Sequence, residues 1–188
     1  MRMTNLMAIA LCMSLLAAAV RAQSEDATPV LREYFASMQA GDFERSAGFF
    51  HPEALSAFRE SLSFWKEIPE EAQDGFLDAF FGASATPETV EEKNDAEFFA
   101  AFLTAVMKQA GAAGSLNFDG MEILGAVAEE DDVLHYVTRN RVSLGEIEIK
   151  SMEVVSVQLT EAGWLLQLSG QMEGVAEQLK AAFAGQMP

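Results

Sequence analysis

Four polar residues on two neighbouring predicted strands are the first candidates for chemistry. Tyr136, Thr138 and Asn140 occupy alternate positions in one strand, and Glu153 lies in the next. Alternate residues of a strand point to the same face of a sheet. A carboxylate among apolar walls has a raised pKa, and a tyrosine hydroxyl can donate to a developing oxyanion. Tyr136 and Glu153 are therefore the candidate catalytic acid–base pair.

The position of the hairpin turn sets which residues of the two strands face each other. A two-residue turn at residues 144–145 places Tyr136 opposite Glu153. The same register places Arg141 opposite Glu148, which predicts a cross-strand ion pair on the other face. The face that carries Tyr136 is the more apolar one, so we expect it to meet the helices.

A bulge in the second strand would change this arrangement. The apolar residues change phase between Ile149 and Met152, which hints at a β-bulge. Such a bulge would turn Glu153 toward solvent and leave Tyr136 as a core residue with its hydroxyl at the rim. The acid–base interpretation and this structural interpretation both stay open.

The other residue types that carry chemistry are few and badly spaced. The two histidines, His51 and His135, are far apart in the sequence. His51 precedes a proline, where a helix-capping or turn role is expected, and His135 falls on the outer face of the sheet. Neither they nor the acidic runs match a metal-ligand pattern, and the sequence contains no phosphate-binding, dinucleotide-binding or serine-nucleophile motif. We therefore predict no metal and no cofactor.

The first 22 residues are predicted to be a signal peptide. Arg2 precedes an apolar run, and small residues lead up to a cleavage position near Ala22. We therefore expect export, either to the periplasm or as a secreted protein, with a retained N-terminal anchor as the alternative. Cleavage would remove Cys12, the only cysteine, so the mature chain would have no disulfide and would depend on its hydrophobic core.

The composition restricts the partners. Half of the residues are hydrophobic, which indicates a globular protein, and the formal net charge is −17. Such an acidic surface repels phosphate backbones and anionic lipid heads. We therefore exclude nucleic acid, and also membranes once the signal peptide is removed. A small apolar molecule, a protein partner or a second copy in a homodimer are the partners that remain.

The elements that position these residues change in type along the chain. Apolar residues recur at helical spacing from about residue 28 to residue 111 and then alternate over residues 118–169. A last amphipathic helix is expected over residues 175–183. Helices followed by antiparallel strands predict an α+β fold. Residues 23–188 are predicted to form a single domain.

Two stretches share their pattern with a known superfamily. They are the opening PVLREYFASMQAGDFERSAGFFHPEAL and the closing MEVVSVQLTEAGWLLQLS. Together they resemble the nuclear transport factor 2-like superfamily, which includes ketosteroid isomerase-like and SnoaL-like proteins. The resemblance implies a cystatin-like α+β roll, with N-terminal helices packed on the concave face of a curved antiparallel sheet and a pocket between them. Residues 69–115 depart from this pattern as a helical insertion, which would either close or fill the pocket.

Three functional hypotheses follow, because such a fold serves enzymes and binding domains alike. The leading one is an exported, non-enzymatic domain that binds a small apolar ligand or a protein partner in the concave pocket. The candidate ligand-binding residues are Tyr34, Trp65, Tyr136, Thr138 and Asn140. One alternative is a cofactor-free isomerase, cyclase or hydratase that uses Glu153 and Tyr136. The other is a structural dimerisation domain whose pocket is filled.

Overall fold

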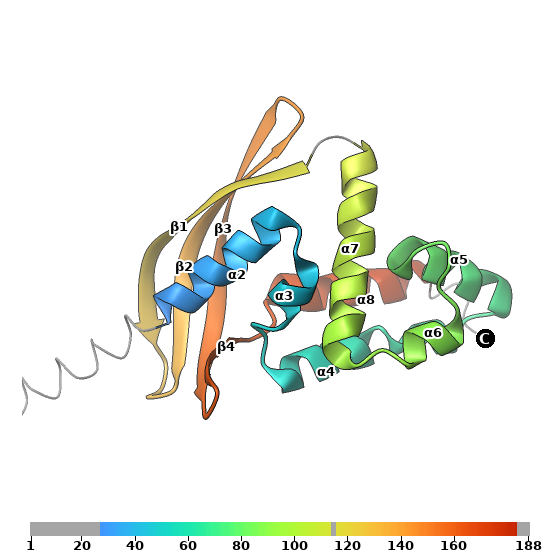
Figure 1. The fold of residues 1–188 in the computed structure, drawn as a ribbon, viewed down its shortest axis with the longest axis horizontal. Coiled ribbons are helices and arrows are strands. Elements are labelled where there is room, and N and C mark those ends of the chain that lie inside the picture. The colour runs from blue at the N-terminus through green and yellow to red at the C-terminus, as the bar shows by residue number, and fades with distance from the viewer. Residues whose placement is uncertain (1–26, 114–115, 184–188) are drawn as a thin grey trace, which may run out of the picture.

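The computed structural model describes residues 27–113 and 116–183, and the predicted signal peptide lies outside them. The described part is an α+β protein with one curved antiparallel sheet of strand order β1-β2-β3-β4 (Figure 1). This confirms the predicted fold class. The elements are α2 (Thr28–Ala40), α3 (Phe43–Ala47), α4 (Pro52–Ser61), the 3-10 helix η1 (Ser63–Lys66), α5 (Glu70–Phe81), α6 (Pro87–Glu91), α7 (Asp95–Ala113), β1 (Leu116–Ala128), β2 (Val133–Leu144), β3 (Ile147–Thr160), β4 (Gly163–Leu166) and α8 (Gly170–Phe183).

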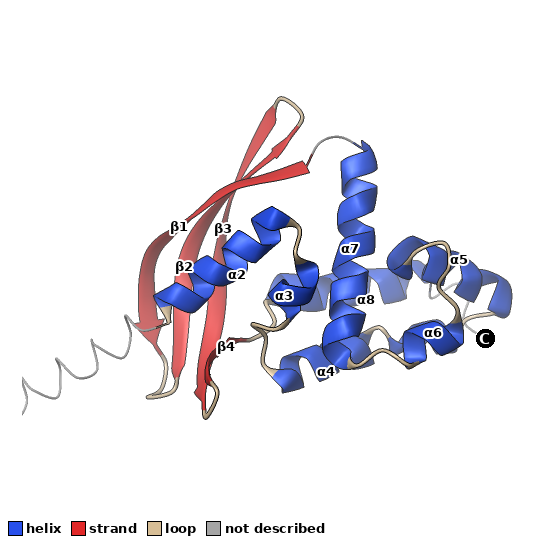
Figure 2. Ribbon diagram, viewed as in Figure 1, coloured by secondary structure: helices blue, strands red, loops and turns tan. Residues whose placement is uncertain are grey.

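The helices divide into one that lies on the sheet and a group beside it. Figure 2 shows α2 crossing the sheet. Helices α4 to α8 lie together beside the sheet, to its right in this view. A hydrogen bond from Gln39 Nε2 to the carbonyl of Phe118, at 2.8 Å, ties the end of α2 to β1. The face of the sheet beneath α2 is called the inner face below.

Several helix ends follow the side chains that the sequence places there. His51 Nδ1 accepts a hydrogen bond from the backbone N–H of Glu53 at 3.2 Å, which confirms its predicted capping role. Asn94 and Glu97 form a reciprocal capping box with two bonds of 2.9 Å. Helix α2 ends at Gly41, whose φ of 69° lies in the left-handed region that favours glycine.

Phenylalanine rings hold the helices together. Phe58 of α4 lies 6.3, 5.0 and 5.1 Å from the ring centroids of Phe98, Phe99 and Phe102 of α7, each in an edge-on arrangement. Phe58 is 1% exposed. Edge-on aromatic pairs add about 0.5–1.5 kcal/mol to the energy of burying their area. The α4–α7 contact is therefore a main source of stability in the helical part.

Arg59 fastens the segment between α6 and α7 to α4. Its guanidinium donates to the carbonyls of Val90, Glu91 and Lys93. It also pairs with the carboxylate of Asp95 at 3.3 Å. The bonds to Val90 and Glu91 satisfy carbonyls at the end of α6, where a helix leaves its last acceptors without partners.

The β2–β3 hairpin turns one residue later than predicted. The loop consists of Gly145 and Glu146. Gly145 has a φ of 60°, and two-residue hairpin loops need a positive φ at their first residue. Arg141 therefore lies opposite Lys150, and Glu148 pairs with Lys150 at 3.2 Å. The predicted Arg141–Glu148 pair was wrong. Because the register differs by two residues, every side chain keeps its predicted face.

The predicted bulge in the second strand is absent. β2 and β3 pair without a break through residues 149–152, and Glu153 lies opposite Thr138 on the inner face. The irregularities of the sheet lie in β1, at residues 118–120 and 123–125. A side chain opposite an inner-face residue shares that face, so Glu153 points inward.

The outer face of the sheet carries the charged residues that the sequence assigned to it. His135 contacts Ser156 through Nδ1 at 2.8 Å and Glu129 through Nε2 at 2.7 Å. Arg139 pairs with Glu122 at 3.0 Å. These contacts confirm that His135 lies outside the space between sheet and helices, and they place Arg139 on the same outer face.

Apolar side chains are also exposed on this outer face. Val127 and Met152 are each 63% exposed, and Val154 is 54% exposed. The predicted homodimer would need such a surface, and it stays a prediction. Among the described residues, no helix combines the length and the apolar character that a membrane span requires.

Candidate ligand-binding cavity

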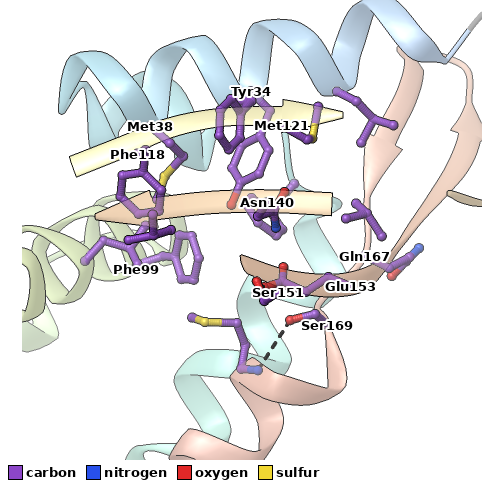
Figure 3. Close-up of a pocket in the computed structure, with 17 residues that line it drawn as sticks. Tyr34, Met38, Phe99, Phe118, Met121, Asn140, Ser151, Glu153, Gln167 and Ser169 are labelled. Atoms are coloured by element: carbon purple, nitrogen blue, oxygen red, sulfur yellow. Dashed lines mark hydrogen bonds between the residues drawn. The ribbon is translucent and has the colours of Figure 1, made fainter. Parts of the chain in front are cut away.

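A cavity of about 180 Å³ lies between α2, the inner face of the sheet and the start of α7. Figure 3 shows its labelled side chains gathered in one place, although they come from α2, α7, the strands β1 to β3 and the segment after β4. The lining residues are Leu31, Tyr34, Phe35, Met38, Phe50, Phe99, Leu103, Phe118, Met121, Asn140, Val142, Ser151, Glu153, Val155, Gln167, Ser169 and Met172. Most of them are apolar or aromatic, as in small-molecule sites generally.

Strand pairing brings the polar residues of the cavity together. Asn140 of β2 pairs with Ser151 of β3, and Glu153 follows two residues later on the same face. The Ser151 hydroxyl donates to Glu153 Oε1 at 3.2 Å. These three side chains form a polar patch on the sheet wall of an otherwise apolar space.

Asn140 has an unusual environment within this patch. Its Oδ1 atom is buried and has no hydrogen-bond partner among the described residues. Buried acceptors are nearly always paired, because an unpaired one loses its bonds to water without replacement. Asn140 is also one of the lining residues, so this unpaired acceptor belongs to a side chain of the cavity wall.

Tyr34 faces the polar patch from the opposite wall. Its side chain extends from α2 toward the strands that carry Asn140 and Glu153 (Figure 3). Burial raises the pKa of the Tyr34 phenol to about 12, and the negative charge of Glu153 adds to the effect. The phenol therefore stays neutral at physiological pH, as a group that can donate a hydrogen bond.

The raised pKa of Tyr34 predicts a loss of stability at alkaline pH. An unfolded tyrosine ionises near pH 10, so the contribution of Tyr34 is full below that pH and is lost as the pH rises toward about 12. When the pH is raised from 10 to about 12, the unfolding free energy of Tyr34→Phe should fall by about 2 kcal/mol less than that of the wild type. Urea denaturation at several pH values measures this difference. Equal losses in both proteins would contradict it.

The predicted site residues divide between the cavity and the core. Tyr34, Asn140 and Glu153 line the cavity. Tyr136 and Thr138 lie on the same sheet face, but they are 2% and 0% exposed and do not line it. Tyr136 and Glu153, the candidate acid–base pair, therefore do not both line this cavity. The tyrosine that lines it together with Glu153 is Tyr34.

Trp65 lies elsewhere. It is 3% exposed and belongs to the helical core next to a separate surface cleft, which Arg59 and Lys66 also line. The helical insertion does reach the cavity, since Phe99 and Leu103 of α7 form part of its wall. The insertion thus forms part of the cavity wall and does not fill the cavity.

Several lining residues were missed by sequence reasoning. Phe50 is brought to the cavity by a bridge to Leu166, in which His51 N and Leu166 N each donate a bond of 2.8 Å across the two segments. Gln167 follows that bridge and lines the cavity too. No local pattern indicates such a pairing between residues more than a hundred positions apart.

Comparisons with known proteins complete the description of the site. In the described part of the chain, no group of three or more histidine, cysteine, aspartate or glutamate side chains is arranged to hold a metal ion. Searches against protein-family models, curated proteins and solved structures gave no significant match. The resemblance to the nuclear transport factor 2-like superfamily therefore stays a prediction from sequence, and the function has to be argued from the cavity.

Proposed function

We propose that this protein binds a small, mainly apolar molecule with one polar group in the cavity beneath α2. One observation carries the proposal, namely an apolar cavity lined by Asn140, whose Oδ1 is buried and has no partner among the described residues. Leaving such an acceptor unpaired costs about 1–3 kcal/mol. A ligand that donates a hydrogen bond to Asn140 would remove that cost, and its apolar part would fill the remaining space.

The size of the cavity limits the ligand. An engineered apolar cavity of about 150 Å³ holds one benzene molecule. At about 180 Å³, the cavity suits one ring with a short substituent or a short branched chain. Benzyl alcohol is therefore a suitable probe, since its ring matches the apolar walls and its hydroxyl can donate to Asn140.

Substituting Asn140 tests the proposal. Asn140→Leu keeps the side-chain shape and removes the acceptor, so the ligand-free protein should gain about 1 kcal/mol of unfolding free energy. The same variant should bind benzyl alcohol about tenfold more weakly, as measured by an NMR titration of backbone amides. Asn117→Leu, at an exposed position, is the matched control. Unchanged binding by Asn140→Leu, or shifts remote from the cavity, would contradict the proposal.

Native mass spectrometry can identify the natural occupant. The protein isolated from its own host should retain a small additional mass, and Asn140→Leu should retain less of it. A wild-type protein that retains no mass and also fails to bind benzyl alcohol would remove the support for a binding function.

A second candidate function is cofactor-free acid–base catalysis. It is favoured by the neutral phenol of Tyr34 facing the carboxylate of Glu153 across the cavity. Glu153 would take a proton from a carbon next to a carbonyl, Tyr34 would donate to the enolate oxygen, and Glu153 would return the proton to another carbon. Deuterium exchange into cyclohexanone tests this step. Exchange that is abolished in Glu153→Gln would support it, and no exchange above buffer would leave the binding function alone.

The third hypothesis, a structural dimerisation domain, requires a filled pocket. The open cavity weighs against it, since Trp65 and the rings of the insertion pack mainly among the helices. A dimer that leaves the cavity accessible is compatible with the binding function.

A further inference from the structure

The sheet wall of the cavity carries a carboxylate beside two side chains that can both donate and accept. Asn140 Oδ1 is buried without a partner among the described residues, and the Glu153 carboxylate offers two further acceptor oxygens. Ser151 already directs its hydroxyl to Glu153 Oε1. A ligand that bonds to Asn140 Oδ1 or to the Glu153 carboxylate must therefore donate hydrogen bonds.

Among the described residues, no cation forms an ion pair with the carboxylate of Glu153. None of the described residues that line the cavity is a lysine, arginine or histidine. The ion pairs in the described part of the chain join other residues. The charge of Glu153 acts on Tyr34 across the cavity, where it helps to raise the phenol pKa. A cationic ligand would supply the missing counter-charge and form a charge-assisted hydrogen bond with this carboxylate.

Aromatic rings surround the same space. They belong to Tyr34, Phe35, Phe50, Phe99 and Phe118. Ring faces attract ammonium groups, and the attraction is strongest where water is excluded. The chain as a whole adds to the effect, because its formal net charge of −17 raises the local concentration of cations.

We propose that the ligand of this cavity is a small protonated amine with an apolar ring or chain. Its ammonium N–H groups would bond to Asn140 Oδ1 and to the Glu153 carboxylate, and its apolar part would lie among the aromatic rings. The proposal rests on the binding function above and specifies the chemical class of the ligand. Aromatic and aliphatic primary amines of about one ring in size fit both the charge and the volume.

Three probes of matched size separate this inference from the binding function. Benzylamine carries the ammonium group, benzyl alcohol is its neutral counterpart, and benzoate carries the opposite charge. Isothermal titration calorimetry and NMR titration of the full protein at neutral pH should give a Kd for benzylamine at least tenfold below that for benzyl alcohol. Benzoate should not bind measurably.

The Glu153→Gln variant locates the effect. It keeps the shape of the side chain and removes its charge, so benzylamine should bind about tenfold to a hundredfold more weakly. The circular dichroism spectrum and the urea midpoint of the variant should match those of the wild type, which shows that the protein is folded. Glu148→Gln, which removes an exposed charge from the outer face, should leave both affinities unchanged.

The outcomes are distinguishable. Tighter binding of benzylamine that Glu153→Gln abolishes would establish the inference. Benzyl alcohol binding as tightly as benzylamine, or benzoate binding at all, would overturn the inference and leave the binding function standing. If none of the three probes binds, the inference fails, and the binding function fails as well when the protein from its own host retains no additional mass.

Discussion

Replacing Phe58 with alanine should lower the free energy of unfolding by about 3–5 kcal/mol. The Phe58 ring is 1% exposed and touches three rings of α7, namely those of Phe98, Phe99 and Phe102. Truncation removes these contacts and leaves a cavity between two helices that cannot move together freely. Urea denaturation followed by circular dichroism measures the loss.

Two further substitutions make this result specific. Phe58→Leu keeps most of the volume and should cost less than alanine. Val127→Ala changes a side chain that is 63% exposed on the outer face of the sheet, and it should alter the unfolding free energy by less than about 0.5 kcal/mol. A Phe58→Ala protein as stable as the wild type would show that the α4–α7 contact does not hold the helices together.

Replacing Arg59 with methionine should cost about 2–3 kcal/mol. Methionine keeps the apolar stem but removes the guanidinium that bonds to the carbonyls of Val90, Glu91 and Lys93. The Arg59 side chain is 27% exposed, so water replaces these bonds only in part. The cation–π contact with Phe98, at 5.1 Å, is lost as well.

An exposed arginine provides the comparison. Arg45 pairs with Glu33 at 3.3 Å, but the two side chains are 57% and 60% exposed. Arg45→Met should therefore change the unfolding free energy by less than about 0.5 kcal/mol. Similar losses for the two arginines would show that the bonds of Arg59 to the α6–α7 segment contribute little.

Local patterns predicted the fold class and the change from helices to strands. The switch from helical to alternating periodicity near residue 115 separates α7 from β1, and the side chains of His51 and Asn94 cap the helices that follow them. These features depend on neighbours in sequence, which is why sequence reasoning finds them. The last helix begins at Gly170, five residues before the predicted start, because helix boundaries depend on more than periodicity.

The candidate site could be predicted only in part. Alternation placed Asn140 on the inner face, and it would have placed Glu153 there too without the apparent change of phase near residue 150. That change reflects Met152 and Val154, apolar residues that the outer face exposes to solvent. An apolar residue on a surface is common, so it is a weak indicator of a bulge.

The remaining features of the site depend on contacts between distant segments. Which of two aromatic residues lines the cavity, Tyr34 or Tyr136, is decided by how α2 crosses the sheet. The missing partner of Asn140 depends on every element that packs around the cavity. Neither property has a signature in a short stretch of sequence.

Helix α7 connects the two parts of the molecule through adjacent residues. Phe98 and Phe102 pack in the helical core, whereas Phe99 and Leu103 form part of the cavity wall. A molecule in the cavity adds contacts to one side of this helix, so the opening of its backbone hydrogen bonds should become rarer when the cavity is occupied. Slower amide hydrogen exchange along α7 would then show that the cavity is occupied. No label in the cavity itself would be needed.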